Sequence, residues 1–256
     1  MVEAKRPSGN REPVEIKSRW VKVGEVNTHY MVAGEGSPLL LLHGGANDWS
    51  DWKSNVGPLS QHYRVYAPDL VGYGLSDGLE SEYTMDYFVN FLDDFTQVLE
   101  LKRANLAGFS VGGGIALGFA LRFPSRVEKL VLVDSTGLGK DINPLGRFIG
   151  TLGTVLGRLR GQRPLPRLKG TERVFFLDRL PEVQTPTLIV WGKKDIYLPV
   201  AYAYLAHKLL ANSQLYVFPQ SGHAPHKERS EEFNRLILDF LGERVQRPLA
   251  LCQLNS

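Results

Sequence analysis

Residues Leu106–Gly114 read LAGFSVGGG, and this stretch decides the fold. A short apolar run leads to Ser110, glycines stand two positions before and after that serine, and a helix-like segment follows. Residues 108–112 match the G-x-S-x-G nucleophile elbow, in which a sharp strand-to-helix turn presents a serine at the end of a sheet. Glycine suits both flanks because such a strained turn leaves no room for side chains. A phosphate-binding loop is the alternative reading, but its spacing and its Gly-Lys-Ser/Thr ending are missing.

Short runs rich in valine, leucine and isoleucine recur on both sides of this stretch. They are apolar throughout, which is typical of strands in a parallel sheet buried on both faces. Before the first run, residues 18–34 have the pattern of an antiparallel pair that enters the edge of the sheet. The apolar runs are 38–44, 63–69, 104–110, 128–135, 185–192 and 213–219.

Helical periodicities lie between several of these runs. Further helices are expected after Ser110, after Pro199 and over 230–241. Alternation of strands and helices predicts an α/β fold with a mostly parallel sheet, helices on both faces and right-handed crossovers. The clearest helical face, on a helix that Thr84 can cap, consists of Phe88, Phe91, Leu92, Phe95, Val98 and Leu99.

One segment, residues 136–183, breaks the alternation because it has no strand pattern and is much longer than an ordinary connection. It carries nine lysines and arginines against four aspartates and glutamates. We interpret it as a short helical lid over the open end of the sheet. Its apolar helical stripe is Leu145, Phe148, Ile149, Leu152, Val155, Leu156 and Leu159. The predicted organisation is an N-terminal extension (1–17), a core (18–135 and 184–242), the lid (136–183) and a C-terminal tail (243–256).

Composition narrows the class of protein. A chain of 256 residues is long enough for one sizeable core. A formal net charge of +3 without a dense basic run does not indicate nucleic-acid binding. The only cysteine, Cys252, excludes a disulfide framework within the chain and a cysteine-based metal site. No apolar run has the length of a signal peptide or a membrane span, so we expect a cytoplasmic protein.

A serine nucleophile needs a histidine base and an acid that orients it, in the chain order Ser, Asp, His. Asp195 follows the strand-like run 185–192, and His223 follows the run 213–219. Both therefore belong to loops at the same edge of the sheet as Ser110. We predict Ser110, Asp195 and His223 as the catalytic triad.

Each partner of the serine has a rival. His226 shares the loop of His223 and is the alternative base. Asp134 ends the run 128–135 and is the alternative acid, although a residue at a strand end often bonds nearby backbone amides instead.

An oxyanion hole needs two backbone N–H donors near the serine. Val111 follows the nucleophile and is expected to supply one of them. Gly45, in the loop after the run 38–44, is the best candidate for the other, because glycine lets the backbone approach a substrate closely. His43, at the end of that run, is expected to brace the loop.

The chain resembles the α/β-hydrolase family. The resemblance rests on LLLLHGG (39–45), APDLVGYGLSD (67–77), GFSVGGG (108–114), LIVWGKKD (188–195) and SGHAPHKERSEEF (221–233), and it covers about 20–241 apart from the lid. It implies the same triad and oxyanion hole, with 136–183 as the variable lid. Serine at the elbow differs from the aspartate of the similar haloalkane dehalogenases and epoxide hydrolases.

Within that family the chain is similar to carboxylesterases and to the carbon–carbon bond hydrolases of aromatic ring breakdown. The latter usually carry asparagine and tryptophan at the positions of Phe109 and Ala224. We expect a substrate pocket lined by Phe109, Phe148, Leu152 and Ala224.

Three functions remain open at this point. The first is a carboxylesterase that acts through an acyl-enzyme. The second is a carbon–carbon bond hydrolase or a perhydrolase on the same triad, and the third is a ligand receptor with vestigial turnover. We expect a small-molecule ester as the partner, and no metal, organic cofactor, nucleic acid or membrane span.

Overall fold

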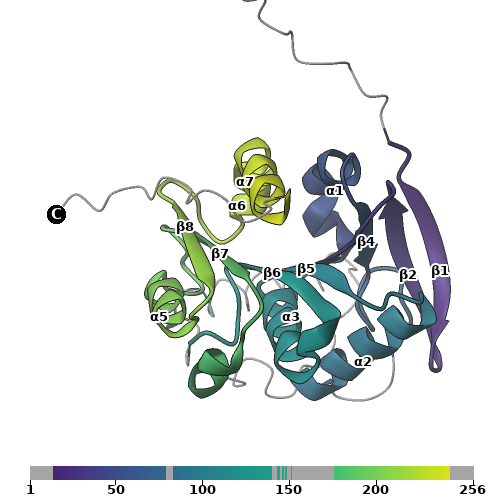
Figure 1. Cartoon of the computed structure of the whole chain (residues 1–256), viewed down its shortest axis with the longest axis horizontal. Coiled ribbons are helices and arrows are strands. Elements are labelled where there is room, and N and C mark those ends of the chain that lie inside the picture. The colour runs from purple at the N-terminus through teal and green to yellow at the C-terminus, as the bar shows by residue number, and fades with distance from the viewer. Residues whose placement is uncertain are drawn as a thin grey trace, which may run out of the picture.

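The computed structural model of the chain describes residues 14–78, 83–139, 143, 144, 146, 148, 151 and 176–242 (Figure 1). In this part of the chain an eight-stranded sheet has the order β1-β2-β4-β3-β5-β6-β7-β8. Its strands are β1 (Lys17–Val23), β2 (Val26–Ala33), β3 (Pro38–Leu42), β4 (Arg64–Pro68), β5 (Ala104–Phe109), β6 (Val127–Val133), β7 (Thr187–Gly192) and β8 (Ser213–Phe218).

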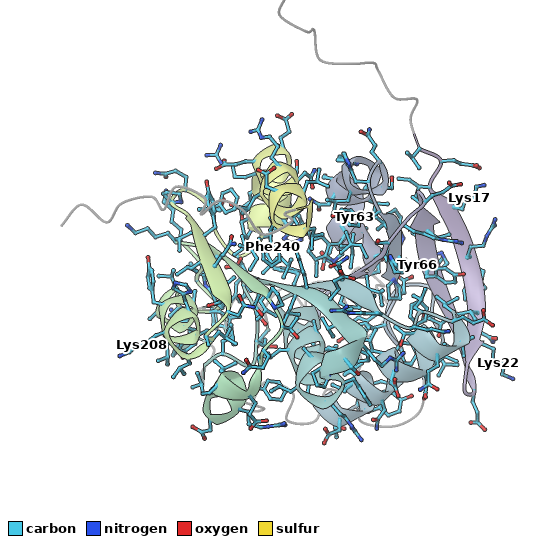
Figure 2. All side chains as sticks on the ribbon, in the orientation of Figure 1. Lys17, Lys22, Tyr63, Tyr66, Lys208 and Phe240 are labelled. Atoms are coloured by element: carbon cyan, nitrogen blue, oxygen red, sulfur yellow. The ribbon has the colours of Figure 1, made fainter. Side chains whose placement is uncertain are left out.

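Strand pairing follows the predicted pattern. β1 pairs antiparallel with β2, and β2 pairs antiparallel with β4, which confirms the antiparallel pair at the sheet edge. All pairs from β4 to β8 are parallel. Lys17 and Lys22 lie near the two ends of the outer strand β1 and are exposed (Figure 2). Such charges discourage another chain from pairing with the free edge.

Helices cover both faces of the sheet. Figure 1 shows α2, α3 and α5 on one face and α1, α6 and α7 on the other. The central strands are therefore apolar on both faces: Leu40 and Leu42 of β3 face one core, while Leu39 and Leu41 face the other. The helices are α1 (Lys53–Ser60), α2 (Met85–Val98), α3 (Val111–Arg122), α5 (Ala201–Leu209), α6 (Pro225–Glu228) and α7 (Ser230–Gly242). The α/β-hydrolase fold predicted from the sequence is confirmed.

The helix predicted from the apolar face at 88–99 is α2. The Thr84 hydroxyl caps it by accepting a hydrogen bond from the Tyr87 amide at 3.1 Å. Four of the six residues on the predicted apolar face are buried, whereas Val98 is 47% exposed and Leu99 only half-buried. Val98 is the last residue of the helix, so the face is fully buried only as far as Phe95.

Helix α1 has no counterpart among the predicted elements. Its sequence KSNVGPLS contains a glycine and a proline and shows no regular apolar stripe. Two of its four buried residues are polar. The buried Asn55 donates to the backbone oxygen of His226 (3.0 Å) and to Oδ1 of Asn234 (2.8 Å), so contacts far away in the chain stabilise this helix.

The predicted lid lies only in part within the described residues. Of its apolar stripe, Phe148 alone is described, and the other six members, Leu152 among them, lie outside; so does the tail 243–256. At its start, the Asn143 amide donates to the backbone oxygen of Tyr197 at 2.8 Å. At its end, Leu177–Glu182 form a 3-10 helix, η4. None of the helices in the described ranges is both long enough and apolar enough to cross a membrane.

Candidate active site

The turn after β5 has the strained geometry that its sequence predicts. Ser110 has φ +51° and ψ −116°, a conformation that costs free energy in a residue with a side chain. A Cβ on Gly108 would lie 2.3 Å from the backbone oxygen of Gly112, and one on Gly112 would lie 2.4 Å from that of Leu42. Glycine is therefore the only residue that fits on either side of the serine without a shift of the backbone.

Hydrogen bonds hold the turn in place. The Ser110 amide donates to the backbone oxygen of Val133 on β6 at 3.0 Å. The Ser110 carbonyl accepts from the amides of Gly113 and Thr136, each at 3.0 Å. Hydrogen bonds to α3, to β6 and to Thr136 therefore stabilise the strained turn. They fix the Ser110 hydroxyl at the start of α3.

The three predicted triad residues lie together. Nε2 of His223 is 3.2 Å from the Ser110 hydroxyl oxygen, and Nδ1 of the same ring is 2.7 Å from Oδ2 of Asp195. The other carboxylate oxygen, Oδ1, accepts from the amides of Tyr197 (2.7 Å) and Leu198 (3.0 Å). These two amides fix the orientation of the Asp195 side chain, which is 0% exposed, so that Oδ2 faces the imidazole.

The structure disfavours the rival base. His226 is fully buried among the rings of Trp52, Phe109 and Phe233. Neither of its ring nitrogens bonds to Ser110 or to Asp195. Burial lowers the pKa of His226 to about 3, so the ring stays neutral and takes up protons poorly.

The rival acid is close to the triad but makes other bonds. Oδ1 of Asp134 accepts from the Gly192 amide at 3.0 Å, as expected for a residue at a strand end. The imidazole Nδ1 of His223 is bonded to Asp195 instead. Asp134 nevertheless lies in the same cluster, since one oxygen of each aspartate and one nitrogen of His223 are all within 4.8 Å of one another.

Gly45 and Val111 lie against each other, as a shared oxyanion hole requires. A Cβ on Gly45 would be 2.8 Å from a methyl carbon of Val111. Val111 is the first residue of α3, so its N–H has no acceptor within the helix. The two residues predicted to supply the oxyanion hole therefore lie side by side, and Val111 directly follows Ser110.

His43 braces the oxyanion loop as predicted. Its side chain is 0% exposed, and its Nε2 accepts from the Leu70 amide at 2.9 Å. Its Nδ1 lies 2.7 Å from the backbone oxygen of Gly44. Burial lowers the pKa of His43, which keeps this link between two loops uncharged.

Asp51 and Lys227 form a part of the site that sequence reasoning missed. Asp51 is 1% exposed, and its Oδ2 accepts from the Gly44 amide at 2.9 Å. Its Oδ1 is bonded to the ammonium group of Lys227 and to the side chain of Asn47. Burial favours the neutral acid, yet Lys227 and the Gly44 amide hold the pKa of Asp51 below its usual value. The ion pair therefore ties the oxyanion loop to the segment that follows His223.

Tyr73 is a second residue that the motifs did not single out. Its hydroxyl oxygen lies 3.7 Å from the position of a Cβ on Gly45 and has no hydrogen-bond partner among the described residues. Burial raises the pKa of Tyr73, so the group stays a donor. Tyr73 therefore places an uncharged phenol O–H beside the loop that carries Gly45.

The predicted pocket residues have different environments. Phe109 is 7% exposed, with its ring between His223 (5.0 Å between centroids) and His226 (4.5 Å). Ala224 is half-buried beside His223, and Phe148 is 65% exposed. Leu152 is outside the described residues. The ring of Tyr197, 4.9 Å from that of His223, is a neighbour of the triad that the sequence did not indicate.

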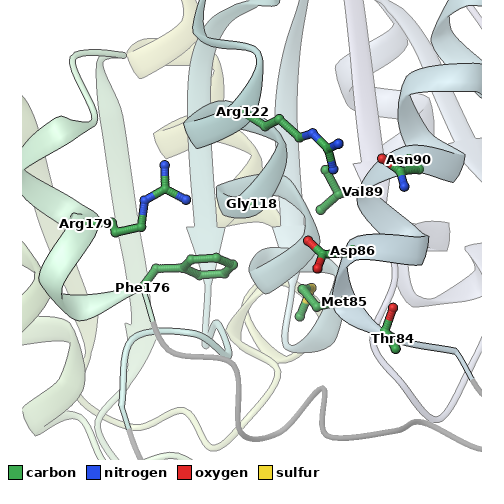
Figure 3. Close-up of a pocket in the computed structure, with 9 residues that line it drawn as sticks. All are labelled: Thr84, Met85, Asp86, Val89, Asn90, Gly118, Arg122, Phe176 and Arg179. Carbon is green, nitrogen blue, oxygen red and sulfur yellow. The ribbon is translucent and has the colours of Figure 1, made fainter.

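A cavity of about 750 Å³ lies away from the triad, between α2, α3 and η4 (Figure 3). None of the predicted site residues lines it. Arg122 of α3 and Arg179 of η4 extend into it from two sides, and Asp86 of α2 lies across from them (Figure 3).

The cluster of Asp134, Asp195 and His223 has donor atoms that a metal ion can use. Both nitrogens of His223 are already engaged, one with Asp195 and one with Ser110. Binding a cation there would break one of these two contacts. The arrangement fits proton transfer between neighbouring side chains better than metal ligation.

The fold, the strained serine and the adjoining histidine–aspartate pair define a hydrolase of the α/β class. The model of the α/β-hydrolase fold family matches residues 37–157. A 2-hydroxy-6-oxo-2,4-heptadienoate hydrolase from Pseudomonas putida is 30% identical, over 87% of this chain and 95% of that protein. The chain belongs to the α/β-hydrolase family.

Solved structures of other α/β hydrolases have the same fold as this chain. A meta-cleavage product hydrolase from Pseudomonas fluorescens (CumD) superimposes with a TM-score of 0.76 and 28% identity, covering 88% of this chain and 97% of that one. The carboxylesterase CesB from Bacillus subtilis gives a TM-score of 0.78 at 24% identity, covering 90% and 92%. The likeness to CesB is one of fold.

Replacement of the nucleophile tests the site most simply. We expect Ser110→Ala to lower kcat for any substrate by about 10⁴-fold or more, as for other serine hydrolases with a triad. The free energy of unfolding should change by less than about 1 kcal/mol, because only a half-exposed hydroxyl is removed. A folded variant with kcat near that of the parent would refute the assignment.

Two histidine variants distinguish the base from its neighbour. His223→Ala should lower kcat by roughly 10³-fold or more, because triad members act as a unit. His226→Leu keeps the volume of a buried ring position and should stay within about tenfold of the parent. Steady-state kinetics measure kcat of both variants, and thermal unfolding checks that both are folded. A larger loss of kcat in His226→Leu than in His223→Ala would contradict the assignment of His223 as the base.

Removal of the charge on Lys227 tests the link between the two loops. Lys227→Met leaves the buried Asp51 carboxylate without its cation, and we expect a loss of about 1–3 kcal/mol of unfolding free energy, since Lys227 is partly exposed. kcat should fall as well, because Asp51 holds the Gly44 amide. The matched control is Lys194→Met, because the exposed ammonium group of Lys194 bonds to Gln220 and to no carboxylate among the described residues. Equal effects of the two substitutions would show that the buried pair has no special role.

Proposed function

We propose that the protein hydrolyses carboxylic esters through an acyl-enzyme on Ser110. The observation that carries this proposal is the continuous pair of contacts from the Ser110 hydroxyl to Nε2 of His223 and from Nδ1 to Asp195. In this arrangement His223 can accept the proton of the Ser110 hydroxyl and later return it. Ester hydrolysis needs no other acid or base.

In the acylation step the Ser110 oxygen attacks the ester carbonyl carbon while its proton moves to Nε2 of His223. The electron pair of the C=O bond moves to the carbonyl oxygen, which accepts hydrogen bonds from the amides of Gly45 and Val111. The tetrahedral intermediate then collapses, the C–O bond to the alcohol breaks, and His223 returns the proton to the departing oxygen. Asp195 stabilises the imidazolium that forms between these two steps.

Deacylation repeats the same chemical steps, with water in place of the serine hydroxyl as the nucleophile. His223 takes a proton from the water as it attacks the acyl carbon, and the Ser110 oxygen leaves with that proton. The acid is released and the enzyme returns to its first state. The lid is proposed to roof the acyl group and so to set specificity, because Asn143, near its start, donates to the backbone oxygen of Tyr197, whose ring lies beside His223.

A second candidate is hydrolysis of a carbon–carbon bond. It is favoured by relatives of 29–31% identity over most of the chain that are named as hydrolases of oxo-dienoates. In that reaction the leaving group is a carbon atom, so the substrate itself must hold the electron pair of the broken bond and accept the proton. A conjugated dienoate with an oxo group can delocalise that electron pair. A simple ester does not need such a group, because its leaving group is an alcohol oxygen.

A direct comparison of substrates tests the proposal. We expect multiple turnovers of p-nitrophenyl butyrate, and kcat/KM at least tenfold above that for 2-hydroxy-6-oxo-hepta-2,4-dienoate, followed by the loss of its absorbance. Ser110→Ala is the control for background hydrolysis. The reverse order would establish the carbon–carbon hydrolase instead. A single slow acylation without turnover would indicate a receptor with vestigial chemistry.

A further inference from the structure

Asp134, at the end of β6, has a carboxyl group that solvent does not reach. Its side chain is 0% exposed and its backbone has φ +39°, which is unusual for a residue with a Cβ. The Asp134 amide donates to the backbone oxygen of Val190, and Oδ1 accepts from the Gly192 amide, each at 3.0 Å. Oδ2 has no donor among the described residues. The group is thus fixed, with one oxygen unsatisfied.

The unsatisfied oxygen belongs to a cluster with the triad. One oxygen of Asp134, one of Asp195 and one nitrogen of His223 all lie within 4.8 Å of one another. The Asp195 side chain is also 0% exposed. Two carboxylates this close in a site closed to solvent repel each other, and the cost of desolvation adds to that repulsion. A proton on one of the two carboxyl groups removes both costs.

The surroundings decide which carboxyl holds it. Asp195 accepts from two amides and faces His223, and these contacts stabilise its negative charge. The Asp134 carboxyl group accepts from a single amide, that of Gly192. Burial raises the pKa of Asp134, the nearby charge of Asp195 raises it further, and Glu228 on α6 adds to the rise against the opposing Gly192 amide. His223 is the titratable group that completes the cluster.

We propose that Asp134 is a protonated carboxylic acid that donates a hydrogen bond to Asp195 and so acts as a positioning residue for the triad. The chain of contacts then has four members, from Asp134 through Asp195 and His223 to Ser110. The proton on Asp134 satisfies its free oxygen and holds the Asp195 carboxylate toward His223. The effect on chemistry rests on the proposed function, whereas the protonation itself does not.

Unfolding at several pH values tests the protonation. An unfolded aspartate ionises near pH 3.9, but native Asp134 keeps its proton, so its contribution to stability is complete below about pH 4 and is lost as pH rises toward its native pKa. Asp134→Asn keeps the shape and an N–H donor but cannot ionise. The unfolding constant of the parent divided by that of Asp134→Asn should therefore rise by up to tenfold per pH unit from about pH 4.

Urea unfolding between pH 4 and 7 measures this ratio. Asp178→Asn is the matched control, because Asp178 is exposed on η4. The unfolding constant of the parent divided by that of Asp178→Asn should not change with pH. A ratio for Asp134→Asn that stays flat or falls would overturn the proposal. Should Asp134→Asn not fold, the infrared band of a protonated carboxyl in the native parent at pH 6 decides the question, and its absence there overturns the proposal equally.

Reaction with a fluorophosphonate tests the positioning role without a substrate. The Ser110 oxygen bonds to phosphorus, fluoride leaves, and the serine proton goes to His223. We expect the labelling rate constant to fall by roughly 10²-fold in Asp134→Ala and by less than tenfold in Asp134→Asn, whose amide still donates to Asp195. Equal losses in the two variants would overturn the positioning role. Failure of the parent to turn over either substrate would refute the proposed function alone, since labelling and the pH ratio do not depend on it.

Discussion

The strained turn at Ser110 is the constraint on which the rest of the site depends. Its positive φ puts the hydroxyl at the start of α3, and no side chain fits at Gly108 or Gly112. The strain persists because bonds to β6 and to Thr136 hold the turn from several directions. His223, Asp195 and the two residues predicted to form the oxyanion hole are all arranged around this fixed point.

Four loops at one edge of the sheet must keep their relative positions for the site to work. Hydrogen bonds and a buried ion pair hold them, rather than apolar contacts alone. His43 connects the loop after β3 to the loop after β4. Asp51 and Lys227 connect the loop after β3 to the segment after His223, and Gly192 connects the end of β7 to Asp134. Buried polar links of this kind act over short distances and specify one arrangement, since a broken link leaves an unpaired group in a dry interior.

The sequence predicts the fold well, and the three side chains of the predicted triad lie in contact, because these features depend on local chemistry. Apolar runs, a glycine-flanked serine and polar residues directly after strands can each be recognised within a few positions. The pair of Asp51 and Lys227 could not be found in this way, since its members are 176 residues apart and no local pattern in the sequence connects them. Helix α1 was missed for a similar reason, because Asn55 depends on partners in the last fifth of the chain. Val98 continued the helical period but lay beyond the buried part of the helix.

Under the proposed function, Ser110 carries the acyl group during turnover. The decisive experiment is to quench the enzyme with acid within milliseconds of mixing with p-nitrophenyl butyrate and to analyse its peptides by mass spectrometry. We expect a butyryl group on the peptide that contains Ser110, and no such mass in Ser110→Ala. Turnover with an unmodified chain, or an acyl group on another residue, would contradict it.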